Sequence, residues 1–261
     1  MNASAGPPLR RLEGRVALIT GTSGGQGRAA ALRFAAEGAI VVGCGRNPKA
    51  ADETVDLVRA AGGEMYSTAP VDLGEVAEVE AWVKDAASRF GRIDILYNNA
   101  AAPVWASIDD MTDDDWHTTQ RNELDLVFYA CRAAWPHLKR SRHAVVINVA
   151  SVSAMVALRP AMGAVAHSAT KGGVLALTRE LANEGAPEGI RVNTLTPGYI
   201  RVPVIADIFD QIADQLIGKQ MLKRVGMPED IASVAAFLAS DDAAFMTGAN
   251  VVVDGGATAG D

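Results

Sequence analysis

The stretch VALITGTSGGQGRAAALRFAAEGAIVVGCG, residues 16–45, decides which fold this chain is expected to adopt. It opens with a short apolar strand, passes through a glycine-rich turn at Thr20–Gly27, and continues as a helix of small residues that ends at Gly38. A second apolar strand, residues 39–45, follows directly. A strand, a glycine turn, a helix and a second strand in this order are typical of a βαβ unit in a parallel sheet.

The same alternation continues to the end of the chain. Further strands are expected at residues 64–71, 93–97, 144–150, 190–196 and 249–255, and further helices at residues 49–63, 75–90, 113–139, 163–185, 204–220 and 228–239. The strands are continuous apolar runs, as expected when helices cover both faces of the sheet. We therefore predict an α/β fold, a single doubly wound Rossmann-type domain over residues 1–261. It should contain about seven parallel strands flanked by helices, preceded by a flexible N-terminal tail at residues 1–10.

Composition excludes several classes of protein. The 261 residues carry a formal net charge of −7 with no block of basic residues, so nucleic acid and anionic membranes are not expected partners. The N-terminal segment MNASAGPPLRRLEG lacks the apolar core of a signal peptide, and no apolar run reaches the roughly 18–20 residues of a membrane span. Cys44 and Cys131 are too few and too far apart for a disulfide framework or a metal site. We expect a cytoplasmic protein.

The glycine-rich turn is a candidate phosphate-binding loop. Gly21, Gly25 and Gly27 would let backbone amides approach a pyrophosphate at the N-terminus of the following helix, where the helix dipole favours negative charge. The spacing is G-x-x-x-G-x-G rather than G-x-G-x-x-G. A plain tight turn would also use glycines, but the strand before and the helix after favour a dinucleotide site.

The end of the second strand bears on cofactor choice. A dinucleotide site normally places an Asp or Glu there to bind the adenosine ribose, whereas this strand ends in VVGCGRN without an acid. Arg46 at the tip is suited to a 2′-phosphate. NADP(H) is therefore the expected cofactor and NAD(H) the second choice, and a solvated loop arginine is the alternative interpretation.

Thr20–Gly27 resembles the T-G-x-x-x-G-x-G motif of the short-chain dehydrogenase/reductase family. The segments VDL (residues 71–73), DILYNNA (residues 94–100), Pro197–Gly198 and TGANVVVDGG (residues 247–256) resemble later motifs of that family, although Ala101 stands where one of them ends in glycine. Together with the glycine loop and Arg46, these motifs give the expected cofactor-binding set, which is Gly21, Ser23, Gly25, Gln26, Gly27, Arg46, Asp72, Leu73, Asn99, Ala100, Lys171, Pro197, Gly198 and Ile200.

The resemblance also implies a chemistry, hydride transfer between a nicotinamide and an alcohol or carbonyl. The family uses an Asn, a Ser and a Tyr-x-x-x-Lys pair, which map here onto Asn122, Ser151 and Lys171. His167 occupies the tyrosine position, four residues before the lysine. In the family the lysine lowers the pKa of the tyrosine and binds the nicotinamide ribose, and the tyrosine exchanges the substrate proton.

An imidazole is able to replace a phenol as acid or base, because its reference pKa of about 6.5 lies nearer neutrality than the phenol value of about 10. The charge of Lys171 should favour the neutral ring, which suits a base in alcohol oxidation. The alternative is that His167 fills a position whose chemistry has been lost. Tyr199, directly after the Pro-Gly motif, is the one tyrosine placed to substitute.

The substrate side is less specific. The segment between Ser151 and His167 is Met- and Ala-rich and suggests an apolar pocket. The expected substrate-contacting residues are Ser151, Ser153, Met162 and Tyr199. The histidine spacing indicates no metal site. Family members are commonly oligomeric, so a homodimer or homotetramer is expected.

Three functional hypotheses remain open at this point. The first is an NADP(H)-dependent oxidoreductase acting on a small, apolar alcohol or carbonyl substrate with His167 in place of tyrosine. The second is a catalytically impaired dinucleotide-binding scaffold or sensor, which would have no use for Ser151. The third is a reductase of an activated C=C bond, in which hydride transfer depends less on the missing tyrosine.

Overall fold

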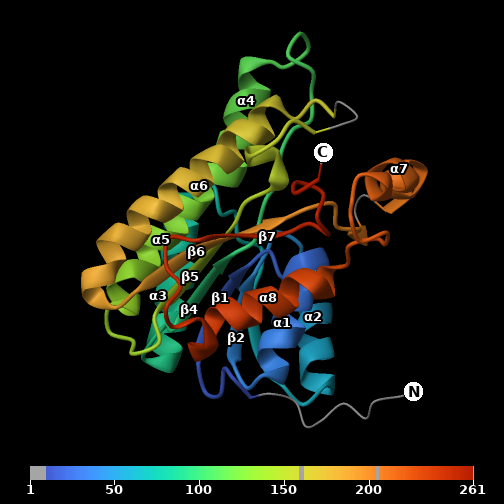
Figure 1. Cartoon of the computed structure of the whole chain (residues 1–261). Helices are drawn as coiled ribbons and strands as arrows, with labels where there is room; N and C mark the ends of the chain where they lie inside the picture. The colour runs from blue at the N-terminus through green and yellow to red at the C-terminus, as the bar shows by residue number, and fades with distance from the viewer. Residues whose placement is uncertain (1–9, 159–161, 204–205, 261) are drawn as a thin grey trace, which may run out of the picture.

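The computed structural model describes residues 10–158, 162–203 and 206–260 (Figure 1). Residues 1–9 of the expected tail and residues 204–205 at the start of an expected helix lie outside this range.

Within the described residues, seven parallel strands form one sheet in the order β3-β2-β1-β4-β5-β6-β7. This confirms the predicted sheet. The strands are β1 (Val16–Thr20), β2 (Ile40–Cys44), β3 (Glu64–Thr68), β4 (Ile95–Asn98), β5 (Val145–Val149), β6 (Arg191–Pro197) and β7 (Asn250–Val253). The third strand ends earlier than predicted, because Pro70 has no backbone N–H to continue the ladder. Val71 N–H turns instead to the carbonyl oxygen of Gly45, at 2.9 Å.

The helices cover both faces of the sheet (Figure 1). They are α1 (Gly25–Ala36), α2 (Pro48–Ala60), α3 (Val76–Phe90), α4 (Asp113–Gln120), α5 (Leu126–Leu138), α6 (Val165–Gly185), α7 (Ala206–Gly218) and α8 (Pro228–Ala239). Apolar residues of α1, α2 and α8 form one core with the sheet, and those of α3, α5 and α6 form a second core on the opposite face. Two buried layers enclose the strands, which explains why their sequences are continuously apolar.

The long helix predicted at residues 113–139 is interrupted. It consists of α4, a π-helical turn at Arg121–Asp125, and α5. Thr112 begins α4 with a capping box, in which its hydroxyl accepts from Asp115 N–H at 3.1 Å and the Asp115 carboxylate accepts from Thr112 N–H at 3.2 Å. A π turn holds one more residue per turn than an α-helix and therefore changes which side chains face a neighbouring helix. Here it turns Glu123 inward, where its side chain is fully buried.

The strand order positions the site. β1 lies between β2 and β4, so the direction in which strands are added to the sheet reverses at this point. Ligands of open parallel sheets bind in the crevice outside the carboxyl ends of the strands at such a reversal. The glycine loop after β1, the turn after β2 and the segment after β4 all leave the sheet at this edge.

Candidate active site

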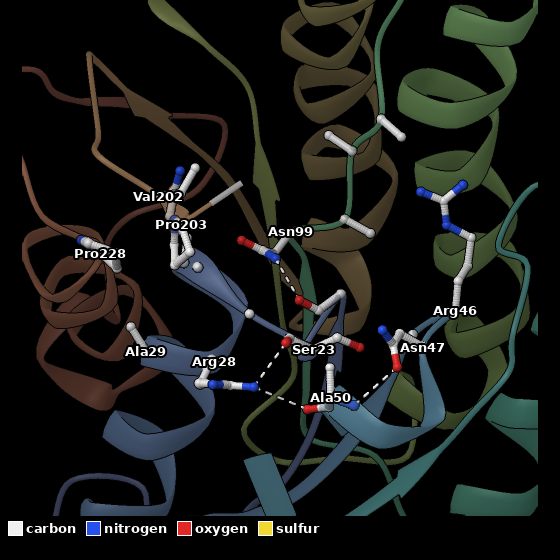
Figure 2. A pocket seen from close by; sticks show the side chains of 18 of the residues that line it. Ser23, Arg28, Ala29, Arg46, Asn47, Ala50, Asn99, Val202, Pro203 and Pro228 are labelled. Atoms are coloured by element: carbon white, nitrogen blue, oxygen red, sulfur yellow. Dashed lines mark hydrogen bonds between the residues drawn. The ribbon is translucent and has the colours of Figure 1, made fainter. Parts of the chain in front are cut away.

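A cavity of about 990 Å³ lies at this edge of the sheet (Figure 2). The expected cofactor residues that line it are Gly21, Ser23, Gly25, Gln26, Arg46, Asp72, Leu73, Asn99 and Ala100. Gly27, Lys171, Pro197, Gly198 and Ile200 belong to the described residues but are not part of its lining. Ile200 is buried and pairs with Gly226 through an isolated β-bridge. The volume is that of a small-molecule or cofactor site.

Close packing fixes the glycine loop. A Cβ atom on Gly27 would lie 2.1 Å from the carbonyl oxygen of Gly21, so only glycine allows α1 to start this close to the loop. Asn99 ties the loop to the end of β4, because its backbone N–H donates to Thr20 Oγ1 at 2.9 Å and its Nδ2 donates to Thr20 O at 3.1 Å. The loop is therefore a rigid element.

Polar groups without partners face this loop region. Gly24 begins α1 and provides no side-chain cap for the first helical amides. Ser23 Oγ and Gln26 Oε1, both from cavity-lining residues, are buried without a hydrogen-bond partner in the part of the chain that the structure describes. Buried polar atoms in native proteins are nearly always paired, so these two atoms indicate a ligand-binding site. Helix N-terminal amides and a serine hydroxyl are the donors that a pyrophosphate requires, and the residues present fit a dinucleotide.

Arg46 and Arg28 have different surroundings. Arg28 is held by the protein itself, since its guanidinium donates to Thr54 Oγ1 at 2.9 Å, to Ser23 O at 3.1 Å and to Ala50 O at 3.2 Å. Arg46 is exposed at the tip of β2 and lines the cavity (Figure 2). Asn47 fixes this tip by capping α2, accepting from Ala50 N–H at 3.2 Å. Arg46 is thus an exposed cation at the cavity.

Asp72 is anchored on the other side of the cavity. Arg121 Nη2 lies 2.8 Å from its Oδ2, and Gly74 N–H donates to its Oδ1 at 2.9 Å. Burial raises the pKa of Asp72, but the bonds from Arg121 and Gly74 outweigh it and hold the pKa below its ordinary value. Asp72 therefore faces the cavity as a fixed carboxylate.

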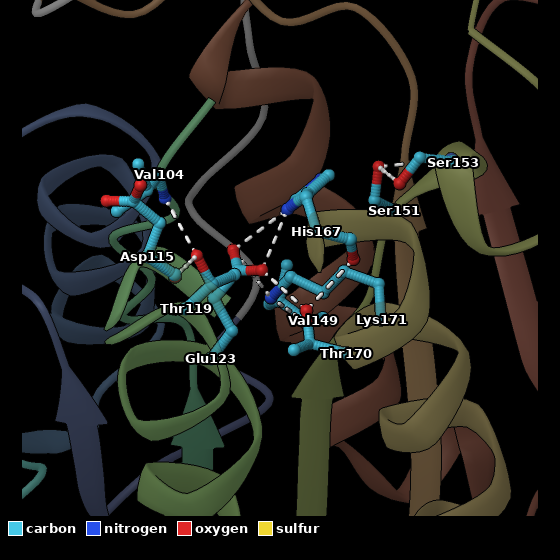
Figure 3. Close-up of polar contacts among 10 residues, drawn as sticks. All are labelled: Val104, Asp115, Thr119, Glu123, Val149, Ser151, Ser153, His167, Thr170 and Lys171. Atoms are coloured by element: carbon cyan, nitrogen blue, oxygen red, sulfur yellow. Dashed lines mark hydrogen bonds and ion pairs between the residues drawn. The ribbon is translucent and has the colours of Figure 1, made fainter. Parts of the chain in front are cut away.

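In the first two turns of α6, His167 and Lys171 lie close to a third titratable side chain, that of Glu123 (Figure 3). The imidazole Nδ1 lies 2.9 Å from Oε1 and 2.8 Å from Oε2 of Glu123. Thr170 Oγ1 donates to the same carboxylate at 2.7 Å, and Lys171 Nζ lies 3.9 Å from it. Lys171 also donates to the carbonyl oxygen of Val149, at 3.0 Å. The sequence predicted a His–Lys pair, and the structure shows a His–Glu–Lys cluster.

The cluster is shielded from solvent and charged. Glu123 is fully buried, Lys171 is 3% exposed and His167 is 9% exposed. Burial raises the pKa of Glu123, but the hydrogen bond from His167 and the charge of Lys171 hold it below its ordinary value. Burial lowers the pKa of Lys171, and the charge of Glu123 offsets only part of that effect. Glu123 is therefore an ionised carboxylate inside the protein.

An aromatic residue covers the imidazole. The Trp105 ring lies over His167 with 5.0 Å between the ring centroids, and its side chain is half exposed. Its loop is held in place by Val104 N–H, which donates to Thr119 Oγ1 at 3.0 Å, and by a β-bridge between Ala106 and Ala164 at the start of α6. Trp105 thereby shields the cluster from one side.

The serine pair lies close by. Ser151 begins a 3₁₀ turn directly after β5, and its Oγ accepts from both the N–H and the Oγ of Ser153, at 3.2 and 3.0 Å. Ser151 is half-buried and Ser153 is buried. In the view of Figure 3, His167 lies between Glu123 and the two serines. A substrate oxygen near Ser151 would thus approach the ring edge of His167 that Glu123 leaves open.

Comparisons with known proteins agree with this geometry. A family model described as Enoyl-(Acyl carrier protein) reductase matches residues 21–258. The meso-2,3-butanediol dehydrogenase of Serratia marcescens is 39% identical over 252 residues, covering 96% of this chain and 97% of the relative. The cyclohexanol dehydrogenase of Acinetobacter sp. strain SE19 is 34% identical over 95% of this chain and 96% of its own. This chain belongs to the short-chain dehydrogenase/reductase family.

Solved structures support the assignment. A short-chain type dehydrogenase/reductase from Mycobacterium marinum superposes with a TM-score of 0.90 at 31% identity, covering 97% of this chain and 98% of that one. The structure of gox2181 gives a TM-score of 0.91 at 32% identity, over 96% and 98% of the two chains. The chain is therefore an oxidoreductase of the short-chain dehydrogenase/reductase type, a family whose members use NAD(P)(H) and act on small alcohols or carbonyls.

Asn122 lies in a different place from the other catalytic candidates of this short-chain dehydrogenase/reductase. Its Oδ1 accepts from Arg121 Nη1 at 3.3 Å, and the residue lines the cofactor cavity. Among the described residues it makes no hydrogen bond to Ser151, His167 or Lys171. The next residue, Glu123, provides the contact to His167. Sequence reasoning missed it, although an acid next to the apolar run Leu126–Leu138 was a usable signal.

The remaining candidates are spread out. Tyr199 lines a separate cavity of about 270 Å³ together with Gln220 and Asp254, rather than the cofactor cavity. Met162 is half-buried, next to residues 159–161 that lie outside the described range. Met155 and Val156 are 46% and 43% exposed and add apolar surface just after Ser151 and Ser153.

The part of the chain that the structure describes has neither a membrane-spanning helix nor a metal site. No helix there is long and apolar enough to cross a membrane. No group of three or more His, Cys, Asp or Glu side chains there is arranged to hold a metal ion.

Proposed function

We propose that this chain is an NADP(H)-dependent oxidoreductase that interconverts an apolar secondary alcohol and its ketone, with His167 as the proton acceptor and donor. The observation that carries the proposal is the hydrogen bonding of the two ring nitrogens of His167. Its Nδ1 is bound to Glu123, and no described residue forms a hydrogen bond with Nε2. A ring nitrogen that is left available at the edge of an active site is the group a general base requires.

Each residue then has a role. When bound, the dinucleotide supplies the hydride acceptor or donor. In alcohol oxidation His167 Nε2 removes the hydroxyl proton, and in ketone reduction the protonated ring returns it to the oxygen. The Ser151 hydroxyl donates a hydrogen bond to the same oxygen. Lys171, anchored to Val149 O, stabilises the Glu123 carboxylate.

The apolar nature of the substrate is supported by the surface around the serines. Trp105, Met155 and Val156 are all partly exposed there. The two dehydrogenase relatives named above take a butanediol and cyclohexanol by their names, and both are small alcohols. We extend that substrate class to this chain.

NADP(H) selectivity is supported by Arg46, because a guanidinium at the tip of β2 pairs well with a 2′-phosphate and no carboxylate stands beside it on that strand end. We expect Arg46→Ala to lower kcat/KM for NADP⁺ by about 10- to 100-fold, the loss of one charge-assisted hydrogen bond. The value for NAD⁺ should stay within about twofold. Equal losses for both cofactors would contradict a 2′-phosphate role.

A second candidate is reduction of an activated C=C bond. The description of the matching family model, an enoyl reductase, supports this second candidate.

We also propose a homodimer or homotetramer. Phe128, 43% exposed on α5, supports this proposal.

The test is steady-state turnover by the full chain with NADP⁺ and NAD⁺ over secondary alcohols from pH 6 to 10, and with NADPH over ketones and an enoyl thioester. We expect alcohol and ketone turnover in the wild type and about 10²- to 10⁴-fold less in His167→Ala, the usual contribution of general acid–base catalysis. Unchanged turnover in His167→Ala would refute the role of His167. Turnover of the enoyl thioester alone would establish the second candidate, and cofactor binding without any turnover would indicate a scaffold.

A further inference from the structure

We infer that Glu123 is a positioning residue, which fixes His167 in the tautomer that carries its proton on Nδ1 and so presents Nε2 to the substrate. The inference rests on the proposed function, in which His167 exchanges the substrate proton. It adds a residue that the family motifs of this chain did not identify, and it makes the imidazole and the carboxylate one functional unit.

The first argument is the geometry of the contact. Both Glu123 oxygens lie within 2.9 Å of Nδ1. An ionised carboxylate only accepts hydrogen bonds, so Nδ1 must carry a proton as long as Glu123 is charged. The neutral imidazole has a single N–H, and with that proton on Nδ1 the lone pair is on Nε2. The contact therefore decides which nitrogen acts as the base.

The second argument is how Glu123 is kept charged. Its carboxylate is fully buried, and it receives hydrogen bonds from His167 and from Thr170, with Lys171 at 3.9 Å. These partners keep the pKa of Glu123 below its ordinary value despite burial. A protonated Glu123 would donate to Nδ1 and reverse the tautomer, so a low pKa is what the positioning role requires.

The third argument is charge balance over the groups that face the imidazole. Lys171 and Thr170 face it from α6, Glu123 from the π turn, Trp105 from the loop before α4, and the Ser151 and Ser153 hydroxyls from the end of β5. Asp115 on α4 is already engaged in the Thr112 capping box. Among these groups Glu123 is the carboxylate that faces both Lys171 and the imidazole. Proton uptake by His167 creates an imidazolium that Glu123 stabilises directly, as a carboxylate does in a Ser-His-Asp triad.

The fourth argument concerns stability. Replacing a buried ion pair with apolar residues of similar volume is often neutral or stabilising, so a buried carboxylate is not needed to hold α6 against the π turn. Leu124, the next residue, is partly buried and already packs against the apolar core on this face of the sheet. The buried charge of Glu123 is better explained by its contact with His167.

The test compares three variants at one cluster. Glu123→Gln keeps the shape and removes the charge, and its amide is able to donate to Nδ1 as well as accept from it. Glu123→Asp keeps the charge on a shorter stem. Thr170→Val is the matched control, because it removes another hydrogen bond to the same carboxylate without touching the imidazole.

The first readout is ¹⁵N NMR of histidine-labelled full chain without cofactor, with the His167 signals assigned by their loss in His167→Ala. The chain has four histidines, so the spectrum is tractable. We expect the Nδ1–H tautomer in the wild type, Glu123→Asp and Thr170→Val, and a mixture or the Nε2–H tautomer in Glu123→Gln. A purely structural role would leave the tautomer unchanged in all variants that fold.

The second readout is turnover. We expect kcat of Glu123→Gln to fall by about 10- to 100-fold, the effect of losing one charge-assisted hydrogen bond, with little change in KM for NADP⁺. The inference is overturned if Glu123→Gln keeps both the Nδ1–H tautomer and kcat, or if Thr170→Val alters the tautomer as Glu123→Gln does. It is also overturned if the wild type itself shows the Nε2–H tautomer, a result that does not require any variant to fold.

The two proposals fail in different ways. If His167→Ala retains turnover, the proposed function fails, whatever the tautomer. If His167→Ala is inactive while Glu123→Gln behaves as the wild type in both readouts, the proposed function stands and the role of Glu123 is refuted.

Discussion

A tyrosine placed at position 167 should give little alcohol oxidation unless the carboxylate beside it is also removed. His167→Tyr places a phenol next to Glu123, a buried anion whose oxygens now lie 2.8 and 2.9 Å from the imidazole Nδ1. A tyrosine works as a base through its phenolate, and two buried anions oppose each other. In Glu123→Gln/His167→Tyr the phenolate would face Lys171 without a competing carboxylate.

The size of the effect follows from Coulomb's law. The phenol oxygen reaches further than Nδ1, and at about 6 Å with an effective dielectric constant of about 20 the repulsion is about 3 kcal/mol. That energy equals about two pKa units, so the phenolate fraction in the single variant should be about 100-fold smaller than in the double variant. Because Glu123→Gln is expected to lose about 10- to 100-fold when His167 is present and to gain about 100-fold when Tyr is present, the coupling energy between the two positions should be about 4–6 kcal/mol in a double-mutant cycle.

The assay is kcat/KM for alcohol oxidation in the wild type, both single variants and the double variant, from pH 7 to 10. Ultraviolet difference spectra against the Glu123→Gln parent would follow ionisation of the new tyrosine. The double variant should exceed His167→Tyr by about 100-fold at neutral pH. Equal activity of the two, or a more active single variant, would refute the electrostatic reasoning even if both proteins fold normally.

Two further predictions concern the scaffold. Gly27→Ala places a Cβ 2.1 Å from Gly21 O, so it should lower the free energy of unfolding by about 2–3 kcal/mol and weaken dinucleotide binding. In Gly24→Ala the new Cβ meets nothing within 4 Å, so the free energy of unfolding should change by no more than about 0.5 kcal/mol. Equal denaturation midpoints for the two variants would contradict the packing described. Glu37 is buried against Arg11 and Arg33, and although burial raises its pKa, these arginines hold the pKa below its ordinary value of 4.5. The stability that Glu37 contributes is therefore present above pH 4.5 and is lost as the pH falls through the lower folded-state pKa. In urea denaturation from pH 3 to 7, the free energy of unfolding should fall less steeply toward acid pH in Glu37→Gln than in the wild type. An unchanged slope would show that another group controls the acid dependence.

The sequence predicted the architecture because each decisive signal was local. Continuous apolar runs such as residues 144–150 indicated buried parallel strands, and the glycines after β1 required a close approach that the Gly27 geometry bears out. The strand ends differed by a few residues, and β3 stopped where Pro70 interrupts the ladder. These features depend on residues that are adjacent in the sequence, which is why the sequence alone predicts them.

The His–Glu–Lys cluster depends on the helical register at Glu123, which the local sequence indicates only weakly. Asn122 and Glu123 are adjacent, so they point about 100° apart on a regular helix, and the choice between them depends on the helical register. The π turn at Arg121–Asp125 changes that register by one residue, and both α4 and the π turn contact α6. Lys171 was expected as the charged neighbour of His167 because it lies four residues away. Glu123 lies 44 residues away and needed the tertiary structure.

The contact between Trp105 and His167 gives this protein an internal optical reporter. A protonated imidazole close to an indole quenches its fluorescence more strongly than a neutral one, and the two rings lie 5.0 Å apart between centroids. The emission of Trp105 should therefore follow proton uptake by His167 in real time, in the free protein as well as during turnover. With the other three tryptophans of the chain replaced by phenylalanine, stopped-flow emission would separate the proton step from the hydride step, which absorbance of the nicotinamide already records.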